Sequence, residues 1–407
     1  MLKKFVKSIL LVAGACSLLC CFDGESVSST ALSSDSSLVC KYPYTVLPQI
    51  IIETEDFQEV KSRDNAVPAK VQVWEDSASR TEKVESTIKG RGNSTWWYPK
   101  KPYTLKFSHA RPLLGMPAAK KWIMLANYRD RTLIRNAVAM ELSRRTSLAW
   151  TPSGVFADVY LNGTFMGNYY VCEKIEVKEN RLNVGENGFL LEFNPNTDPD
   201  EPSFRTKFND FNANIKYPKE LDSARYGSIK DFVDSVEYLV QLAKDDSSYL
   251  KYVNIESFAN YYMVYMLSTN TELSFPKSAF VHKDETGKIN AGPVWDFDYL
   301  TFDIRQTGLL NSEFPYYKQF FNKPSFRRTL LQRWKASKDR LYTMDSFIDS
   351  LANYIALSDE QDAKLWPIMI DADLVGDETL PFAEAVDMMK KALRAKMDEL
   401  DSLLPLL

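Results

Sequence analysis

Two short segments of the chain hold residue types that could bind and transfer a phosphate group. The first is a turn-rich loop at residues 90–96, followed by a strand-like segment that carries Lys101 and Lys106. Glycines let backbone amides approach phosphate oxygens closely, and a lysine on the next strand adds a positive point charge. The loop residues that would do this are Gly90, Arg91, Gly92, Asn93 and Ser94. A structural turn without a ligand is the alternative, because turns often contain a Gly-x-Gly sequence.

The second segment spans residues 292–298, where one residue separates Asp296 from Asp298. In an extended segment, side chains at i and i+2 point the same way, so we expect these two carboxylates to act together. Hard oxygen ligands of this kind suit Mg²⁺ or Mn²⁺, which stay partly hydrated and share phosphate oxygens. Glu272 precedes this segment and adds a third carboxylate. The alternative is an acidic, hydrated turn beside a buried tryptophan.

The first half of the chain is predicted to be rich in β-strands, and it must position the glycine loop. Strands are predicted at residues 46–52, 69–74, 102–107, 155–161, 165–175 and 188–193, several of them with clear alternation of apolar and polar residues. One amphipathic helix is expected at residues 131–145, with Asp130 as its N-cap and Glu141 in its last turns.

The second half is predicted to be rich in helices. Apolar residues at helical spacing predict helices at 226–244, 255–267, 324–355 and 382–404, and a hairpin-like piece at 278–283 and 288–295 interrupts them. A β-rich part, a helix-rich part and a site at their junction define an α+β, two-lobed plan.

Composition excludes several classes of function. The chain has only two histidines and no CxxC sequence, which makes a Cys/His zinc site and a Ser-His-Asp triad improbable. Its formal net charge of −4 argues against nucleic acid as the main partner. Asp296 and Asp298 are also too close in sequence to be the acid and nucleophile of a glycosidase. The chemistry must therefore use carboxylates, lysines and backbone amides.

The N-terminus has the features of a bacterial lipoprotein signal. Three lysines precede an apolar run at residues 8–15, which ends in small residues before Cys16. We expect residues 1–22 to be the signal and lipid anchor at Cys16, and residues 23–41 to be a Ser-rich flexible tether. The protein would then lie in the cell envelope, anchored to a bacterial membrane and facing outside the cytoplasm. A simple cleaved signal with incidental cysteines is the alternative.

Two cysteines remain outside the signal region, Cys40 and Cys172. They could pair in an oxidising compartment, or each could be a buried free thiol.

Five segments together resemble the CotH kinase family, which comprises spore coat protein H and its relatives. They are residues 90–107, 122–136, 159–174, 188–193 and 276–298, and they occur in the family's order. The most specific are the Gly-Arg-Gly-Asn-Ser-Thr and Gly-Pro-Val-Trp-Asp-Phe-Asp sequences. The resemblance covers roughly residues 85–300, which would be the core of the domain. We expect the whole CotH kinase-like domain to span residues 42–407, with residues 301–407 as a helical C-terminal extension.

The resemblance implies an atypical protein-kinase-like fold that transfers phosphate from ATP to a protein substrate, with Mg²⁺ or Mn²⁺. Residues 90–94 would face the nucleotide, and either Lys101 or Lys106 would contact its phosphates. Glu141 could pair with that lysine, although an ion pair on the helix surface is the commoner fate of such a glutamate. Asp296 would bind metal and be essential for catalysis, and Asp298 would be a second metal ligand or would order the loop.

The chain departs from the family's pattern at two positions. Glu272 stands where active members carry an aspartate, and Ser278 stands where a metal-binding asparagine is expected. Glutamate is one methylene longer than aspartate, and misplacing a catalytic group by about 1 Å can cost ~10²-fold in rate. Glu272 would still be the catalytic proton acceptor of an active kinase. In the alternative, the protein is a catalytically inactive surface lipoprotein that acts as a binding or assembly module.

Overall fold

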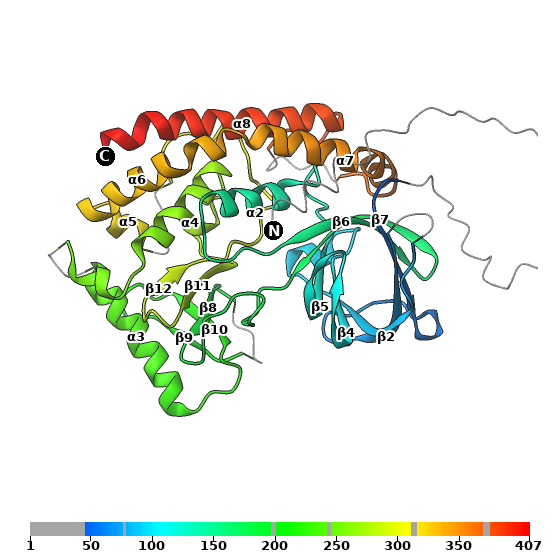
Figure 1. Ribbon diagram of the computed structural model, residues 1–407, viewed down its shortest axis with the longest axis horizontal. Coiled ribbons are helices and arrows are strands. Elements are labelled where there is room, and N and C mark those ends of the chain that lie inside the picture. The colour runs from blue at the N-terminus through cyan, green and yellow to red at the C-terminus, as the bar shows by residue number, and fades with distance from the viewer. Residues whose placement is uncertain (1–44, 76–78, 197–200, 242–245, 311–315, 369–374) are drawn as a thin grey trace, which may run out of the picture. The chain divides into compact units, whose positions relative to one another are not determined.

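The first seven strands close into a barrel (Figure 1). The computed structural model describes residues 45–75, 79–196, 201–241, 246–310, 316–368 and 375–407. The barrel strands are β1 (Gln49–Thr54), β2 (Val67–Trp74), β3 (Val84–Gly90), β4 (Tyr103–Leu113), β5 (Met116–Leu125), β6 (Gly154–Leu161) and β7 (Thr164–Glu173). Their order is β1-β2-β3-β4-β5-β7-β6. Only the closing pair, β1 with β6, is parallel; the other neighbours in the barrel are antiparallel.

Alternation along the strands decides which side chains fill the barrel. Leu105 and Trp122 are fully buried inside it, in an apolar cluster with residues from all seven strands. Their neighbours Lys106 and Lys121 therefore point outward, because successive side chains of a strand lie on opposite faces. The outer face of β3, β4 and β5 is thus free to form the wall of a site.

A second, smaller sheet follows the barrel in the chain. Its strands are β8 (Phe189–Phe193), β9 (Ser203–Arg205), β10 (Asn212–Tyr217), β11 (Ala279–Lys283) and β12 (Ile289–Ala291). The order is β12-β11-β8-β10-β9, with antiparallel pairing throughout. The hairpin of β11 and β12 delivers the segment that contains Asp296 and Asp298.

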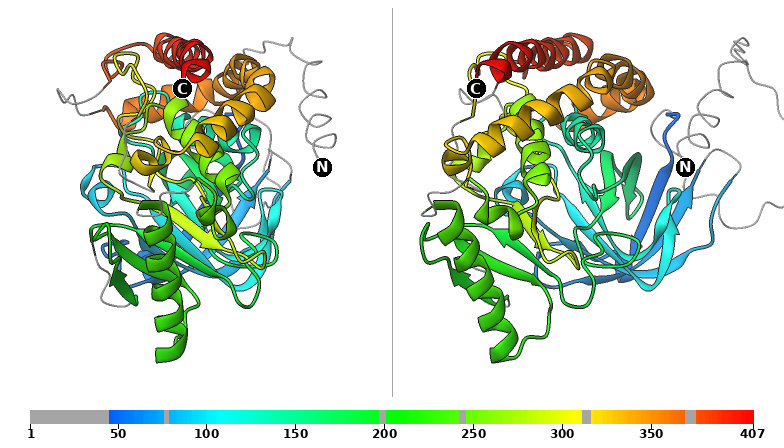
Figure 2. Two further views of the ribbon diagram at one scale, coloured as in Figure 1. Left: turned by 90° about the vertical axis from the view of Figure 1, so that its left-hand side faces the viewer. Right: turned by 60° about the vertical axis from the view of Figure 1, so that its left-hand side comes forward.

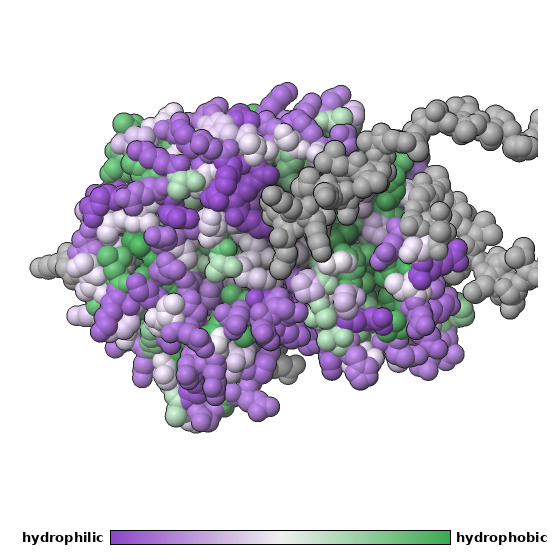
Figure 3. All heavy atoms as spheres, in the orientation of Figure 1, coloured by the Kyte–Doolittle hydropathy of each residue, from purple (hydrophilic) through white to green (hydrophobic). Residues whose placement is uncertain are grey.

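Helices make up most of the second half. They are α2 (Arg135–Arg145), α3 (Ser223–Gln241), α4 (Ile255–Leu267), α5 (Tyr317–Phe320), α6 (Pro324–Leu341), α7 (Met344–Leu365) and α8 (Phe382–Leu403). Every residue of α4 from Ser257 to Leu267 is buried, and this helix contacts α2, α6, α8 and β12. The long C-terminal helices lie together over α2 and α4 (Figure 2). The surface over α8 is largely hydrophilic, in keeping with helices that are charged on one side (Figure 3).

The structure confirms a β-rich N-terminal part and a helix-rich C-terminal part, with two differences in the helices. The helix expected at 131–145 begins only at Arg135, because Leu133 has a positive φ of 59° that interrupts helical geometry. Asp130 is therefore not the N-cap residue, although its Oδ2 accepts a hydrogen bond from the Arg135 amide at 2.8 Å. The run expected at 324–355 is broken between α6 and α7. Within the described part of the chain, no helix has both the length and the apolar character that a membrane span needs.

Candidate functional site

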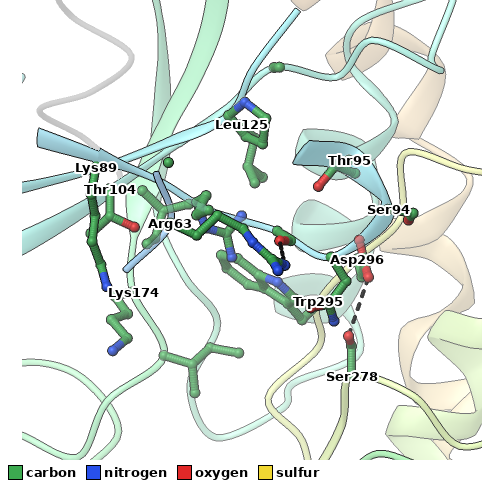
Figure 4. A pocket seen from close by; sticks show the side chains of 18 of the residues that line it. Arg63, Lys89, Ser94, Thr95, Thr104, Leu125, Lys174, Ser278, Trp295 and Asp296 are labelled. Atoms are coloured by element: carbon green, nitrogen blue, oxygen red, sulfur yellow. Dashed lines mark hydrogen bonds between the residues drawn. The ribbon is translucent and has the colours of Figure 1, made fainter. Parts of the chain in front are cut away.

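A cavity of about 930 Å³ lies against the outer face of the barrel. Its walls come from β3, β4 and β5, from the glycine loop, from β8 and β10, and from the segments before β11 and after β12. The two segments singled out from the sequence therefore line the same cavity (Figure 4). They lie about 200 residues apart in the chain, so only the fold brings them together.

Asp296 lines the cavity in a strained backbone conformation. Its φ of 70° lies in the left-handed region, which non-glycine residues rarely adopt and which often marks a functional site. Ser278 Oγ donates to Asp296 Oδ2 at 3.2 Å, and Asn270 Nδ2 donates to the Asp296 carbonyl at 3.3 Å. The expectation of an extended segment at 296–298 is wrong, because the chain turns at Asp296. Both carboxylates nevertheless line the cavity.

Asp298 is buried, and its carboxylate interacts electrostatically with that of Asp296. Burial, followed by the nearby charges of Asp296 and Asp130, raises the pKa of the Asp298 carboxyl to about 7, while Arg91 acts in the opposite direction. Two carboxylates this close repel each other, and a cation would relieve that repulsion. The loop is held in place from α2, because the amide of Phe297 donates to Asn136 Oδ1 at 2.8 Å.

Glu272 begins a short 3₁₀ helix, η4 (Glu272–Ser274), beside this pair. It is not among the residues that line the cavity. Its Oε2 is buried and accepts no hydrogen bond from the residues that the structure describes. Burial, and then the charge of Asp296, raises the pKa of the Glu272 carboxyl to about 9, which Lys277 partly offsets.

This donor set fits a divalent cation that also binds phosphate. Among the described residues, no three His, Cys, Asp or Glu side chains form a closed metal cluster. Mg²⁺ needs no such cluster, since it keeps several waters and takes one or two carboxylates together with substrate phosphates. Asp296 and Asp298 would supply those carboxylates, and the unpaired oxygen of Glu272 lies near them.

The glycine loop is tied to the rest of the barrel through its first residues. The amides of Gly90 and Arg91 donate to the carbonyls of Ser62 and Pro102, at 2.8 and 3.1 Å. These two amides are therefore already used and do not contribute to a phosphate cradle. Gly92 has a φ of +84°, and a Cβ there would collide with the Thr95 hydroxyl. The glycine thus permits a tight turn, whose carbonyl accepts a hydrogen bond from Arg63.

Arg91 is the loop residue that faces the carboxylate pair. Burial lowers the pKa of its guanidinium, whereas the nearby Cys172, Asp296 and Asp298 act to raise it. The guanidinium carbon lies 5.5 Å from the centre of the Trp295 ring. Arg91 thus links the barrel electrostatically to the segment that follows β12.

The two lysine candidates have different positions. Lys106 lines the cavity and is exposed, whereas Lys101 does not line it and donates to the Trp96 carbonyl at 2.7 Å. Glu141 also lies outside the cavity lining. It pairs with Arg145 at 2.9 Å and Arg144 at 3.5 Å on the surface of α2, which is the surface ion pair that the sequence left open and not a pair with Lys101 or Lys106.

A buried lysine–carboxylate pair does exist, between residues that the sequence analysis did not select. Lys100 Nζ lies 2.7 Å from Asp362 Oδ1 of α7, and both side chains are buried. The same Nζ donates to the Asn168 carbonyl at 2.5 Å. This pair ties the segment that follows the glycine loop to a helix more than 200 residues away in the chain.

Most of the positive charge in the cavity was not predicted from the sequence. The additional basic lining residues are Arg63, Lys89, Lys100, Lys121, Arg129, Lys174, Lys216 and Lys277. Basic side chains outnumber the acidic ones in the lining, although the chain as a whole is acidic. Residues 116–125 carry little signal for this, because two adjacent lysines are followed by a continuous apolar run and the polar and apolar residues do not alternate.

The remaining predictions concern cysteines. Cys16 and Cys40 lie outside the described residues. Cys172 is a free, fully buried thiol, and burial raises its pKa to about 12. Cys172 is therefore part of the core and has no reactive thiolate.

The family match, and not the architecture of the barrel, makes this a kinase-like protein. The family model described as CotH kinase protein matches residues 88–397, and the chain belongs to the CotH kinase family. The match extends well beyond residue 300 and includes α6, α7 and most of α8. No curated protein matches the chain.

Proposed function

We propose that the protein is an extracytoplasmic, membrane-anchored protein kinase that transfers the γ-phosphate of ATP to protein hydroxyls with a divalent metal. One observation carries this proposal: the glycine loop and the carboxylates of Asp296 and Asp298 line one cavity whose other charges are mostly basic. Phosphoryl transfer requires mainly positioning and charge neutralisation, and this cavity offers the groups for both.

The residues divide into two sets in this proposal. Asp296 and Asp298 would hold Mg²⁺ or Mn²⁺, which neutralises charge on the transferred phosphate when bound. Gly92, Asn93 and Ser94 would lie along the nucleotide. Arg91, placed beside the carboxylates, takes the role that the sequence analysis gave to a lysine. Lys106 remains a candidate for contact with the nucleotide.

The two-lobed kinase-like plan is part of the same proposal. The barrel would be the N-terminal lobe, and the second sheet with the helices would be the C-terminal lobe. The cavity lining comes from both parts. The lipid anchor at Cys16 and the position outside the cytoplasm rest on the signal-like sequence of residues 1–22.

Nucleotide binding tests the proposal. A ligand that binds only the folded state raises the free energy of unfolding, by about 2.7 kcal/mol when its concentration is 100 times Kd, and therefore raises the melting temperature. We expect ATP with Mg²⁺ or Mn²⁺ to raise the melting temperature of the full chain, and ATP with EDTA to raise it less. No shift at millimolar nucleotide with either metal would refute the kinase proposal.

A second candidate function is a non-catalytic binding or assembly module. Two observations favour it: a serine hydroxyl contacts Asp296 where an amide is expected, and Glu272 does not line the cavity. Binding of nucleotide without any transfer of phosphate would support this second function.

A further inference from the structure

Four lysines line the cavity and form no ion pair in the part of the chain that the structure describes. Lys89 is on β3, Lys106 on β4, Lys121 on β5, and Lys174 directly follows β7. They come from four different segments, yet all four belong to the wall of one cavity. We refer to these four residues as the lysine wall.

The spacing of the lysine wall follows from the strand register. Lys106 lies directly opposite Lys121, and Lys89 lies opposite Thr104, two residues earlier on β4. Directly opposite residues have Cβ atoms about 5 Å apart, and diagonal neighbours about 7–8 Å. The positive charges are therefore distributed over a surface and do not converge on one point.

The lysines repel one another in the absence of a ligand. Burial, and then the neighbouring charge of Lys121, lowers the pKa of Lys174 to about 8. Burial and the charge of Lys106 likewise lower the pKa of Lys121, which Glu176 partly offsets. Anionic groups bound at this wall would relieve the repulsion.

The lysine wall lies apart from the carboxylate pair. In Figure 4, Lys89 and Lys174 are on one side of the cavity, and Asp296 and Ser278 are on the other. Metal-bound phosphates must reach Asp296, near which the half-buried Arg91 already supplies a positive charge. The charges of Lys89, Lys121 and Lys174 are therefore available for a second anionic partner, even if Lys106 contacts the nucleotide.

We propose that the lysine wall binds acidic side chains of the acceptor polypeptide, so that the preferred substrate is a hydroxyl residue in an Asp- or Glu-rich segment. In an extended chain, side chains on one face recur about every 7 Å, which matches the spread of the lysines. The phosphates of a nucleotide are joined through single oxygens and would require a tighter cluster. This inference names the substrate class of the proposed kinase and therefore rests on that function.

Peptide binding without nucleotide tests the inference separately from catalysis. The full chain would be titrated against two short fluorescein-labelled peptides with a central serine, one alternating Glu with Gly and the other Lys with Gly, and anisotropy would be recorded. We expect the Glu peptide to bind at least ~10-fold more tightly, and more weakly as salt is added. The double variant Lys121→Ala/Lys174→Ala should weaken binding of the Glu peptide by about 10-fold, through the loss of two partly solvated charge pairs.

Lys120→Ala is the matched control. Lys120 adjoins Lys121 on β5 but is exposed and outside the cavity lining, so its loss should leave binding of the Glu peptide unchanged. Equal binding of both peptides, or equal binding of the Glu peptide by wild type and the double variant, would overturn the inference. So would loss of the Mg²⁺–ATP melting shift in the double variant, because the lysines would then belong to the nucleotide. A protein that binds the Glu peptide through these lysines but transfers no phosphate would refute only the kinase proposal.

Discussion

At the scale of single residues, the site is defined by carboxylates held in unfavourable surroundings. Asp296 has left-handed backbone geometry, Asp298 is buried beside it, and Glu272 has a buried oxygen without a hydrogen bond among the described residues. Each of these features costs stability in a protein without bound cations. Such costs are typical of sites whose geometry is retained for function.

Glu272→Gln should change how stability depends on pH. The folded-state pKa of Glu272 is about 9, above its ordinary value of 4.5. The protonated carboxyl therefore makes its full contribution to the free energy of unfolding at pH values below 4.5. Its contribution is then lost as the pH rises through about 9. We expect urea unfolding in EDTA to show wild type losing about 1–3 kcal/mol more than Glu272→Gln between pH 5 and 9.

The exposed Glu179→Gln variant is the control for this experiment and should follow wild type. Identical pH profiles for Glu272→Gln and wild type would contradict the buried placement of this carboxyl.

The motif residues could be found from the sequence, but not all of the contacts that hold them. Asp296, Asp298 and residues 90–94 all line the cavity. They could be predicted because their residue types and their order in the chain are specific. The surface ion pair of Glu141 could be foreseen, since Arg145 lies one turn away on the same helix. Lys100 was missed, because its partner Asp362 is distant in the sequence.

At the scale of elements, α7 supports the glycine loop through a buried ion pair. Lys100 adjoins Lys101, whose side chain bonds to Trp96 in the loop, and Lys100 itself is fixed by Asp362 and Asn168. The local periodicity of α7 was readable from the sequence. Its contact with β7 was not, because an amphipathic pattern shows that a face is buried but not which element covers it.

Asp362→Asn should destabilise the protein strongly. It leaves the Lys100 ammonium buried without a counter-charge, and breaking a buried pair in this way typically costs 3–5 kcal/mol. The matched control is Asp349→Asn on the same helix. Asp349 also lies 2.7 Å from its partner, Lys390, but about half of its side chain is exposed.

Chemical denaturation of the two variants compares the same substitution at the same distance with different burial. We expect the exposed pair to contribute less than about 1 kcal/mol to the free energy of unfolding. A similar decrease in the free energy of unfolding for both variants would show that Asp362 does not support the loop.

At the scale of the whole molecule, the long C-terminal helices belong to the core. Buried residues of α6, α7 and α8 share one apolar cluster with α2, α4 and the second sheet. The helical character of residues 301–407 was evident in the sequence, but their packing depends on distant partners. Closure of the barrel through β1 and β6 was equally unpredictable, because it joins residues about 100 positions apart.

The proposed membrane anchor predicts where the whole molecule is found. Cys16→Ser should move the protein from the membrane fraction to the soluble fraction, because the lipid would have no attachment point. Cell fractionation followed by immunoblotting would measure this. The double variant Cys20→Ser/Cys21→Ser is the control and should remain with the membrane; release of this control with retention of Cys16→Ser would place the anchor elsewhere.

Transfer of labelled phosphate is the most direct test of the central claim that the cavity is a kinase site. Wild type, Asp296→Asn and Asp284→Asn would be incubated with γ-labelled ATP, Mg²⁺ or Mn²⁺, and a mixture of acceptor proteins. We expect wild type to label protein and Asp296→Asn to lose at least ~10²-fold of that activity, since the metal that neutralises the phosphate charge is no longer held. Asp284, in the turn between β11 and β12, should be dispensable. Absence of labelling by wild type, or undiminished labelling by Asp296→Asn, would contradict the account.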